Sequence, residues 1–263
     1  MRRRLDAELV RRGLAGSRTE AAEAIRGGQV TVRGTQAEKP STLVAADEPV
    51  ALTATPRRFA SRGGEKLDAA LDRFGVDVQG RRCLDAGAST GGFTDCLLRR
   101  GASAVIAVDV GYGQLAWALR TDPRVIVLER TNVRDLEADA LPFRPSFVAA
   151  DLSFISLRLV LGPLADAAEG AAEFVLLVKP QFEAGREDVG SGGVVRDPAV
   201  WRRVIQEVAD ACREVGLAPG AVMVSPLLGP AGNAEFLLRA VRGAEPVQLD
   251  VEAAIDAATE LVR

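Results

Sequence analysis

Leu84-Asp85-Ala86-Gly87-Ala88-Ser89-Thr90-Gly91-Gly92-Phe93-Thr94-Asp95 is a short apolar run that ends in an acidic, glycine-rich turn and then opens a helix. Glycine lets a backbone take strained angles and approach a ligand closely, so Gly87, Gly91 and Gly92 predict a ligand-binding loop. Such loops lie at the carboxyl end of a strand in doubly wound α/β folds. An ordinary strand–turn–helix corner explains the same residues, so the choice between the two depends on the rest of the chain.

The spacing of the glycines excludes two phosphate-binding motifs. It does not match G-x-G-x-x-G cleanly, and no Lys-Ser/Thr follows to hold a triphosphate. S-adenosylmethionine fits better, because it carries a sulfonium and an amino acid but no polyphosphate. Asp85 and Asp109 would supply carboxylates to this cofactor, and Ser89 lies in the loop between them. Phe93 packs either against the cofactor or against the sheet.

Length and composition limit the class of protein. The 263 residues have room for one full α/β domain and a small appended one. The apolar share of 48% and the charged share of 26% are typical of soluble globular proteins, and no apolar run approaches the roughly 20 residues of a membrane span. Charged residues follow the basic start of the chain, where a secretory signal needs an apolar stretch. We therefore expect a cytoplasmic protein without a membrane partner.

The chain contains no histidine, and its three cysteines lack the spacing of metal ligands. The absence of histidine excludes Ser-His-Asp and Cys-His catalysis. The odd number of cysteines argues against a disulfide framework. We expect no bound metal, and a catalytic base drawn from lysine, aspartate, glutamate or tyrosine.

The first 34 residues carry a net charge of +4, whereas the remainder carries −7. The pattern predicts a helix from Leu5 that closes at Gly13, a capping box over residues 17–20, a second helix to about Ile25, and a strand over residues 29–32 before a turn. This order resembles the S4 RNA-binding domain, and we assign residues 1–55 to it. The resemblance implies that a basic face holds the RNA backbone. The candidate contacts are Arg4, Arg11, Arg12, Arg18 and Arg26.

Residues 56–65 combine a proline, arginines and two glycines, which predicts a basic linker that bends and attracts phosphate. Its candidate RNA contacts are Arg57, Arg58 and Arg62. The alternative is a set of solvated arginines beside a passive hinge.

From residue 66 to residue 263, helical and strand patterns alternate. Helices are predicted over residues 67–74 and 94–100, and strands over residues 82–85, 104–109, 125–128, 147–151 and 174–179. Alternation of this kind predicts an α/β fold with a parallel sheet that helices cover on both faces. The polar residues at the strand ends then gather along one edge of the sheet. They are Asp85, Asp109, Asp151 and Lys179.

Two of the segments at this edge suggest contacts with the nucleoside part of a cofactor. Asp109 lies about 20 residues beyond the glycine loop, where an acidic side chain commonly accepts both ribose hydroxyls. Residues 129–135 follow the next strand and would border the adenine, with Asn132 as our candidate.

The motif after the fourth strand limits the reaction. Methyltransferases that act on amino groups often carry Asn/Asp-Pro-Pro-aromatic there, whereas this chain has Asp151-Leu152-Ser153-Phe154. Methylation of a base carbon would need a nucleophilic cysteine, and no cysteine stands in a suitable motif. A hydroxyl acceptor remains, and it needs a group that removes or shares its proton. Lys179 is the candidate, because burial at the end of its strand would favour the neutral amine.

These motifs together resemble the TlyA family, in which an S4 module is fused to a methyltransferase of the FtsJ/RrmJ 2′-O-ribose class. The resemblance rests on residues 61–67, 84–94, 108–115, 151–156 and 177–183. It implies a Rossmann-like methyltransferase domain and a tetrad of Lys66, Asp151, Lys179 and Glu235. In that tetrad Lys179 activates the ribose hydroxyl, Asp151 and Glu235 fix the ammonium groups, and Lys66 steadies the acceptor. Asp151 also borders the cofactor.

The resemblance further implies methylation of cytidine 2′-oxygens in 16S or 23S ribosomal RNA, or both, near the subunit interface, together with sensitivity to capreomycin and viomycin. The segment after Leu249 suggests the longer type that acts on both subunits. The expected partners are ribosomal RNA and ribosomal subunits, without an obligate protein partner. Two alternatives are a haemolysin, the label that some family members carry, and an RNA-binding protein with an inactive enzyme domain.

Overall fold

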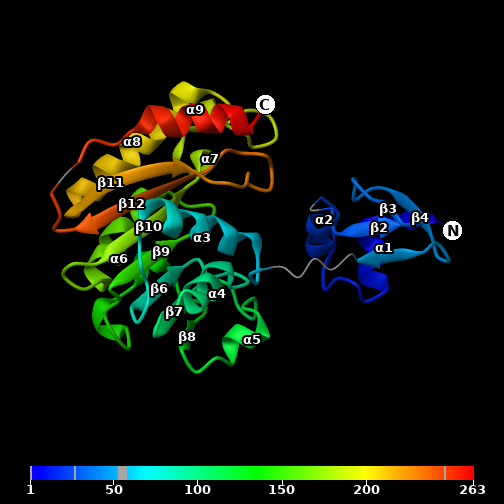
Figure 1. Cartoon of the computed structure of the whole chain (residues 1–263), viewed down its shortest axis with the longest axis horizontal. Coiled ribbons are helices and arrows are strands. Elements are labelled where there is room, and N and C mark those ends of the chain that lie inside the picture. The colour runs from blue at the N-terminus through cyan, green and yellow to red at the C-terminus, as the bar shows by residue number, and fades with distance from the viewer. Residues whose placement is uncertain (1, 27, 53–57, 246) are drawn as a thin grey trace. The chain divides into compact units, whose positions relative to one another are not determined.

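The computed structural model describes residues 2–26, 28–52, 58–245 and 247–263. They belong to two compact units, Met1–Arg57 and Arg58–Arg263 (Figure 1). Arg57, one of the predicted RNA contacts, lies outside the described residues. Among the helices of the described ranges, none combines the length and the apolarity that crossing a membrane requires.

The N-terminal unit is a small α+β domain, as predicted. Its elements are β1 (Arg2–Arg4), α1 (Leu5–Arg11), α2 (Arg18–Arg26), β2 (Val30–Val32), β3 (Thr35–Gln36), β4 (Leu43–Ala45) and β5 (Val50–Leu52). β1 pairs with β4, and β3, β2 and β5 form a second sheet. Arg33 and Gly34 both have positive φ, which makes the tight hairpin turn between β2 and β3. Leu5, Leu9 and Ile25 are buried in the core between the helices and the strands.

A seven-stranded sheet forms the centre of the second unit, in the order β11-β12-β10-β9-β6-β7-β8. Its strands are β6 (Arg82–Ala86), β7 (Ala104–Val108), β8 (Val125–Leu128), β9 (Phe147–Ala150), β10 (Glu173–Val178), β11 (Leu217–Val224) and β12 (Phe236–Arg242). β6 to β10 run parallel, whereas β12 is antiparallel to β10 and β11 is antiparallel to β12. The predicted fold class is confirmed. β11 and β12 were not predicted, and they extend the sheet past β10.

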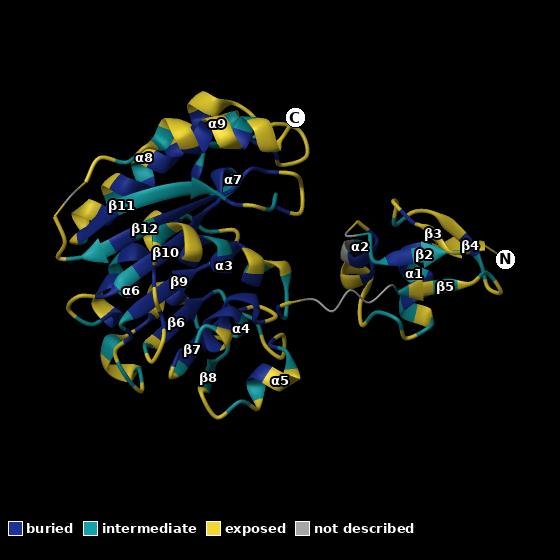
Figure 2. Ribbon diagram, in the orientation of Figure 1, coloured by how far each residue is buried: buried dark blue, intermediate teal, exposed yellow. Residues whose placement is uncertain are grey.

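Helices cover both faces of this sheet. They are α3 (Arg62–Phe74), α4 (Gly92–Arg99), α5 (Trp117–Arg120), α6 (Leu161–Ala167), α7 (Pro180–Glu183), α8 (Pro198–Glu214) and α9 (Val251–Leu261). Leu84 and Ile106 face a core shared with α6, α8 and α9, whereas Cys83 and Val105 face a core shared with α3 and α4. The central strands are therefore buried on both sides (Figure 2), which explains their continuous apolar runs.

The linker predicted over residues 56–65 is corrected in part. Residues 62–65 form the first turn of α3, whose N-cap is Ser61. Phe59 is only 3% exposed, and the Ala60 amide donates a hydrogen bond to Asp95 on α4. Gly64 serves close packing, because a Cβ there would lie 2.4 Å from the Phe59 ring. The module bounds of 1–55 and 66–263 stay a prediction.

Candidate active site

Three adjacent strands bring polar residues to one edge of the sheet. β9 ends immediately before Asp151, β10 ends immediately before Lys179, and β12 begins immediately after Glu235. Val178 is the register partner of Phe236 in the antiparallel pair β10–β12. The end of β10 and the start of β12 therefore lie side by side, beside the end of β9.

Two ion pairs join the four residues of the predicted tetrad. Nζ of Lys179 lies 2.6 Å from Oδ1 of Asp151 and donates a hydrogen bond of 2.9 Å to Oγ of Ser153. Nζ of Lys66, on α3, lies 2.5 Å from Oε2 of Glu235. Lys66, Lys179 and Glu235 are buried, and Asp151 is partly exposed. The structure thus pairs Asp151 with Lys179 and Lys66 with Glu235, at the ends of three adjacent strands and on α3.

The N-terminus of α3 packs directly on the glycine loop. A Cβ on Gly92 would lie 2.1 Å from Oγ of Ser61 and 2.9 Å from the backbone nitrogen of Gly64. A Cβ on Gly63 would lie 3.6 Å from Oδ2 of Asp151. These contacts hold α3, and with it Lys66, against the loop. The sequence analysis missed this role of residues 61–64, although the closely spaced small residues were a signal for it.

The loop glycines are required by packing within the protein. Gly87 has φ of +88°, and a Cβ there would lie 2.4 Å from the backbone oxygen of Asp151. A Cβ on Gly91 would lie 2.2 Å from the side chain of Leu119. The predicted reason for these glycines, approach of a ligand, is thus not needed to explain Gly87, Gly91 or Gly92.

Asp109 organises the opposite side of the loop. Its Oδ2 accepts a 2.8 Å hydrogen bond from the Ser89 amide, and its Oδ1 accepts one of 2.7 Å from the Gly111 amide. The exposed Asn132 caps a 3-10 turn, and Thr131 donates to the backbone oxygen of Asp109. The segments predicted to border ribose and adenine therefore lie side by side.

Asp85 and Phe93 are both buried, whereas direct contact with a cofactor would need their side chains at the surface of the site. Asp85 is fully buried; its Oδ2 accepts a 2.6 Å hydrogen bond from Thr94, and its Oδ1 has no partner among the described residues. Burial raises the pKa of Asp85 to about 7, and Asp151 and Asp109 add to the rise. Phe93 is 3% exposed and belongs to the core under α3, so the structure favours packing against the sheet.

Aromatic side chains at the carboxyl ends of the strands were missed by the sequence analysis. Phe154 is 91% exposed with φ of +64°, and its ring centroid lies 5.1 Å from that of Phe182. Nζ of Lys179 lies 5.8 Å from the Phe182 ring. Tyr112, in the loop after β7, is 69% exposed under the guanidinium of Arg130. The signal in the sequence was an aromatic residue three positions after a strand-end acid, Phe154 after Asp151 and Tyr112 after Asp109.

The predicted RNA contacts of the N-terminal unit divide into two groups. Arg4, Arg11 and Arg18 have exposed side chains that form ion pairs with Asp6 or Glu8, and Arg26 is exposed. The hydrogen bonds to Arg4 and Arg18 lower the pKa of Asp6 to about 2. Arg12 is different, because its guanidinium binds Glu8 and the backbone oxygens of residues 45, 46 and 48. Arg12 therefore stabilises the domain, and the prediction of an RNA contact for it is corrected.

The two remaining arginines belong to the second unit. Arg58 forms a 2.5 Å ion pair with Asp68 and lies over the Phe59 ring. Arg62, at the start of α3, is exposed and forms no side-chain hydrogen bond or ion pair with the other described residues. Arg62 thus has a guanidinium available for a phosphate, whereas that of Arg58 is shared with a carboxylate.

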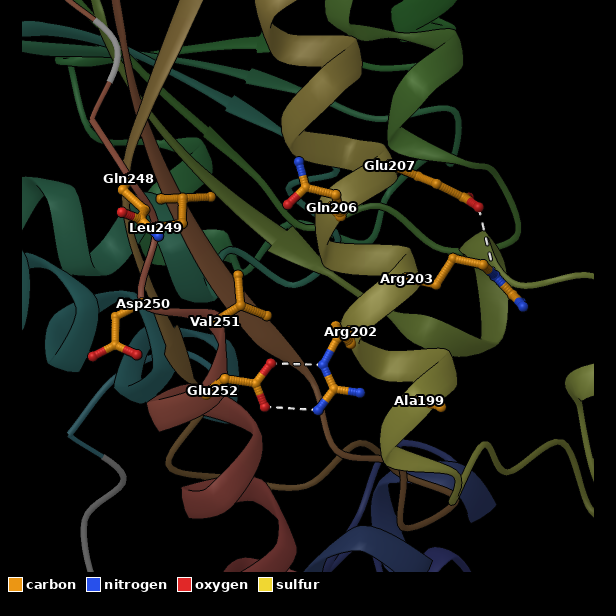
Figure 3. Close-up of a pocket in the computed structure, with 10 residues that line it drawn as sticks. All are labelled: Ala199, Arg202, Arg203, Gln206, Glu207, Gln248, Leu249, Asp250, Val251 and Glu252. Atoms are coloured by element: carbon orange, nitrogen blue, oxygen red, sulfur yellow. Dashed lines mark hydrogen bonds and ion pairs between the residues drawn. The ribbon is translucent and has the colours of Figure 1, made fainter.

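A surface hollow of about 830 Å³ lies between α8 and the segment at the start of α9 (Figure 3). None of the predicted site residues lines it. Two hydrogen bonds of 2.6 Å join Arg202 to Glu252 across it. Its charges are therefore largely neutralised. Within the described ranges, no group of three or more side chains that could hold a metal ion is found. The expectation of a reaction without a metal stays a prediction.

Comparisons with known proteins give matches over both units. A family model described as FtsJ-like methyltransferase matches residues 59–242, and the S4 domain model matches residues 3–50. The 16S/23S rRNA (cytidine-2′-O)-methyltransferase TlyA of Mycobacterium tuberculosis is 55% identical over 90% of this chain and 89% of its own length. YqxC of Bacillus subtilis, named as an rRNA methyltransferase, is 47% identical over 89% of this chain and 84% of its own. A solved structure from Streptococcus thermophilus, which carries a haemolysin name, is 38% identical with a TM-score of 0.78, over 99% of this chain and 95% of its own.

Proposed function

The chain belongs to the TlyA family of S4-domain, FtsJ-like methyltransferases, and on that premise we propose that it methylates cytidine 2′-hydroxyls of ribosomal RNA with S-adenosylmethionine. The observation that carries the proposal is the placement of Lys179 between Asp151 and Ser153 at the sheet edge. The choice of cytidine and of its 2′-oxygen as the acceptor comes from the names of the relatives. This geometry supplies the group that acts on the hydroxyl.

The chemistry requires that the hydroxyl loses its proton as the oxygen bonds to carbon. When bound, S-adenosylmethionine supplies a methyl group on a cationic sulfur. The ribose oxygen gains the carbon that the sulfur loses, and Lys179 takes or shares the proton, which then passes to water. Asp151 orients Nζ of Lys179, whose lone pair receives the proton. The buried Lys66–Glu235 pair holds the adjoining wall of the site.

The residues around the loop suit a cationic cofactor. Asp85, Asp109 and Asp151 lie close enough that the two latter groups raise the pKa of the first. The carboxyl groups of Asp109 and Asp151 beside this loop favour the positive sulfur and ammonium of S-adenosylmethionine. We propose that Asp109 holds the ribose of the cofactor, with Ser89 and Asn132 beside it. Asp85, buried with an unpaired Oδ1, would act from beneath the loop.

The distribution of arginine supports an RNA substrate. In the second unit most guanidinium groups form ion pairs, but within the part of the chain that the structure describes a few exposed ones have no carboxylate partner. Apart from Arg73 and Arg263 at chain or helix ends, these are Arg62, Arg130, Arg134, Arg186 and Arg196. They follow β8 and β10 or begin α3, on the side of Lys179. Unpaired arginines there suit phosphates, and the exposed Phe154 ring suits an unstacked base.

We extend the proposal to both ribosomal subunits near their interface, because the relative with 55% identity is named for both rRNAs. The terminal helix α9, beyond Leu249, agrees with the longer family type. A ribosomal substrate puts the reaction in the cytoplasm. Loss of the methylation would then reduce sensitivity to capreomycin and viomycin.

The test uses purified protein, methyl-labelled S-adenosylmethionine, and separated small and large subunits from a strain that lacks the modification. We expect label in rRNA as 2′-O-methylcytidine, identified by mass spectrometry after nuclease digestion. Label on one subunit only would restrict the proposal to that subunit. Label on a base, or no label on either subunit, would overturn it. Leakage of liposomes without cofactor would instead support the haemolysin alternative.

A further inference from the structure

Glu183, at the end of α7, has a buried carboxylate that no step of the proposed reaction uses. It is 4% exposed. Its Oε2 accepts a 2.5 Å hydrogen bond from the Ser156 hydroxyl, and its Oε1 accepts one of 2.6 Å from the Leu157 amide. Arg158 lies 3.5 Å away and donates to the Glu183 backbone oxygen. Glu183 thus binds residues 156 and 157, a few positions beyond Asp151.

Residues of the same short helix and of its N-cap contact the segment after β9 at two further points. Lys179, the N-cap of α7, contacts Asp151 and Ser153. The Phe182 ring packs on Phe154. We name residues 153–157 the acceptor loop. α7 therefore holds the acceptor loop near its start, at its exposed aromatic ring and at its end.

The acceptor loop needs such support, because Phe154 has a left-handed backbone and an almost fully exposed ring. A bulky residue keeps that conformation only where its surroundings fix it. The contact with Phe182 involves the exposed Phe154 ring, whereas the two hydrogen bonds to Glu183 are short and charge-assisted, one of them buried and the other partly buried. The bonds to Glu183 are therefore the stronger supports.

Burial of a carboxyl group at this position costs free energy of folding. Burial raises the pKa of Glu183, although its hydrogen bonds and Arg158 favour the ionised form. An apolar residue would fill the space without that penalty. A buried acid kept next to the reacting groups points to a role in holding them.

We propose that Glu183 is a positioning residue, which fixes the acceptor loop so that Asp151 and Ser153 stay on Lys179 and Phe154 stays presented to the substrate base. The proposal rests on the proposed function, because it names what sets the geometry of that reaction. It assigns no contact between Glu183 and RNA or cofactor.

The test compares Glu183→Ala with Glu183→Gln, which keeps one carbonyl acceptor for the Leu157 amide and an amide for Ser156. Glu207→Gln is the matched control. Glu207, on α8, accepts a 3.1 Å hydrogen bond from the same Arg158, and among the described residues it forms no hydrogen bond or ion pair with the acceptor loop. For each full-length variant we would measure the single-turnover rate with saturating ribosomal subunits, the Kd for S-adenosylmethionine, and amide hydrogen exchange of residues 152–158.

We expect Glu183→Ala to lower the rate about 100-fold, since small misplacements of reacting groups have effects of that size. The Kd for the cofactor should stay within a factor of about two, because Asp109 and the glycine loop, which form most of the proposed cofactor site, lie outside the acceptor loop. Glu183→Gln should recover most of the rate, and Glu207→Gln should match the wild type. Exchange should rise in residues 152–158 for Glu183→Ala alone.

An unchanged rate in Glu183→Ala, or equal losses in Glu183→Ala and Glu183→Gln, would overturn the proposal. A rise in exchange over the whole second unit would also overturn it, because Glu183 would then only stabilise the fold. If the wild type methylates no ribose, the proposed function fails, whereas the exchange data still show whether Glu183 holds the acceptor loop.

Discussion

Nζ of Lys66 lies 2.5 Å from Oε2 of Glu235, although 169 positions separate the two residues in the chain. Only 8% and 1% of the two side chains are exposed. Two opposite charges that are buried away from water stabilise each other while both are present. Removal of one leaves the other buried and unpaired.

We expect Lys66→Met and Glu235→Gln each to lower the unfolding free energy of the second unit by about 3–5 kcal/mol. The double variant should regain part of that loss while methylation stays low. Urea unfolding followed by tryptophan fluorescence is a suitable measurement, because both tryptophans, Trp117 and Trp201, lie in this unit. A double variant that is less stable than either single variant would contradict the pairing. A double variant with full methylation activity would mean that the pair has a purely structural role.

Lys179→Ala should reduce methyl transfer by about 100-fold or more, the usual effect of losing a proton-transfer group. Affinity for S-adenosylmethionine should change little, because Lys179 acts on the acceptor. Calorimetric titration and a single-turnover assay separate the two quantities. Ser153→Ala is the milder comparison, since it leaves the ion pair with Asp151 intact. Retained turnover in Lys179→Ala would contradict its role.

The parallel strands and the polar residues at their ends could be predicted because a strand buried on both faces is one apolar run, and its carboxyl end must be polar. β11 could not, since it contains proline and glycine and a register shift between Pro219 and Ala221. Pairing of Lys66 with Glu235 follows from no local pattern, and only the family resemblance suggested it. Family membership itself is confirmed.

Arginine roles were harder to predict, because sequence shows a charge but not its partner. Arg12 binds the backbone of its own domain, and Arg58 binds Asp68. Both acceptors lie too far along the chain for helical or strand spacing to connect them. The sequence likewise gave no sign that Glu183 bonds to the loop after β9.

Phe154→Ala should weaken use of the RNA substrate about tenfold, because stacking of one base on an aromatic ring contributes about 1–3 kcal/mol. The effect should appear in kcat/KM for ribosomal subunits and not in the Kd for the cofactor. Phe154→Tyr keeps the ring and should stay close to wild type. Equal loss in both variants would contradict the stacking role of the ring.

Gly87→Ala tests the contact between the glycine loop and Asp151. A Cβ there would lie 2.4 Å from a backbone oxygen, and φ is +88°. Gly80→Ala is the matched control, since Gly80 has φ of +71° with open space around it. We expect a loss of about 1–2 kcal/mol for Gly80→Ala from backbone strain, and about 3 kcal/mol or more for Gly87→Ala once overpacking is added. Similar losses in chemical denaturation would contradict the close approach.

Asp85 should make stability depend on pH in the direction opposite to that of a salt-bridged acid. Burial raises its pKa from 3.8 to about 7. Between these values the folded chain holds a proton that the unfolded chain has lost, so the unfolding free energy falls as the pH rises from about 4 to about 7. The contribution is fully present below about pH 4 and is absent above about pH 7.

Asp85→Asn isolates this contribution, because the amide does not titrate and every other group is unchanged. The stability of the wild type relative to the variant should fall by on the order of 4 kcal/mol across that interval. Denaturation midpoints at several pH values would measure the difference. Parallel curves for the two proteins would mean that Asp85 is ionised throughout, in which case its unpaired Oδ1 must receive a hydrogen bond or a counter-charge in solution.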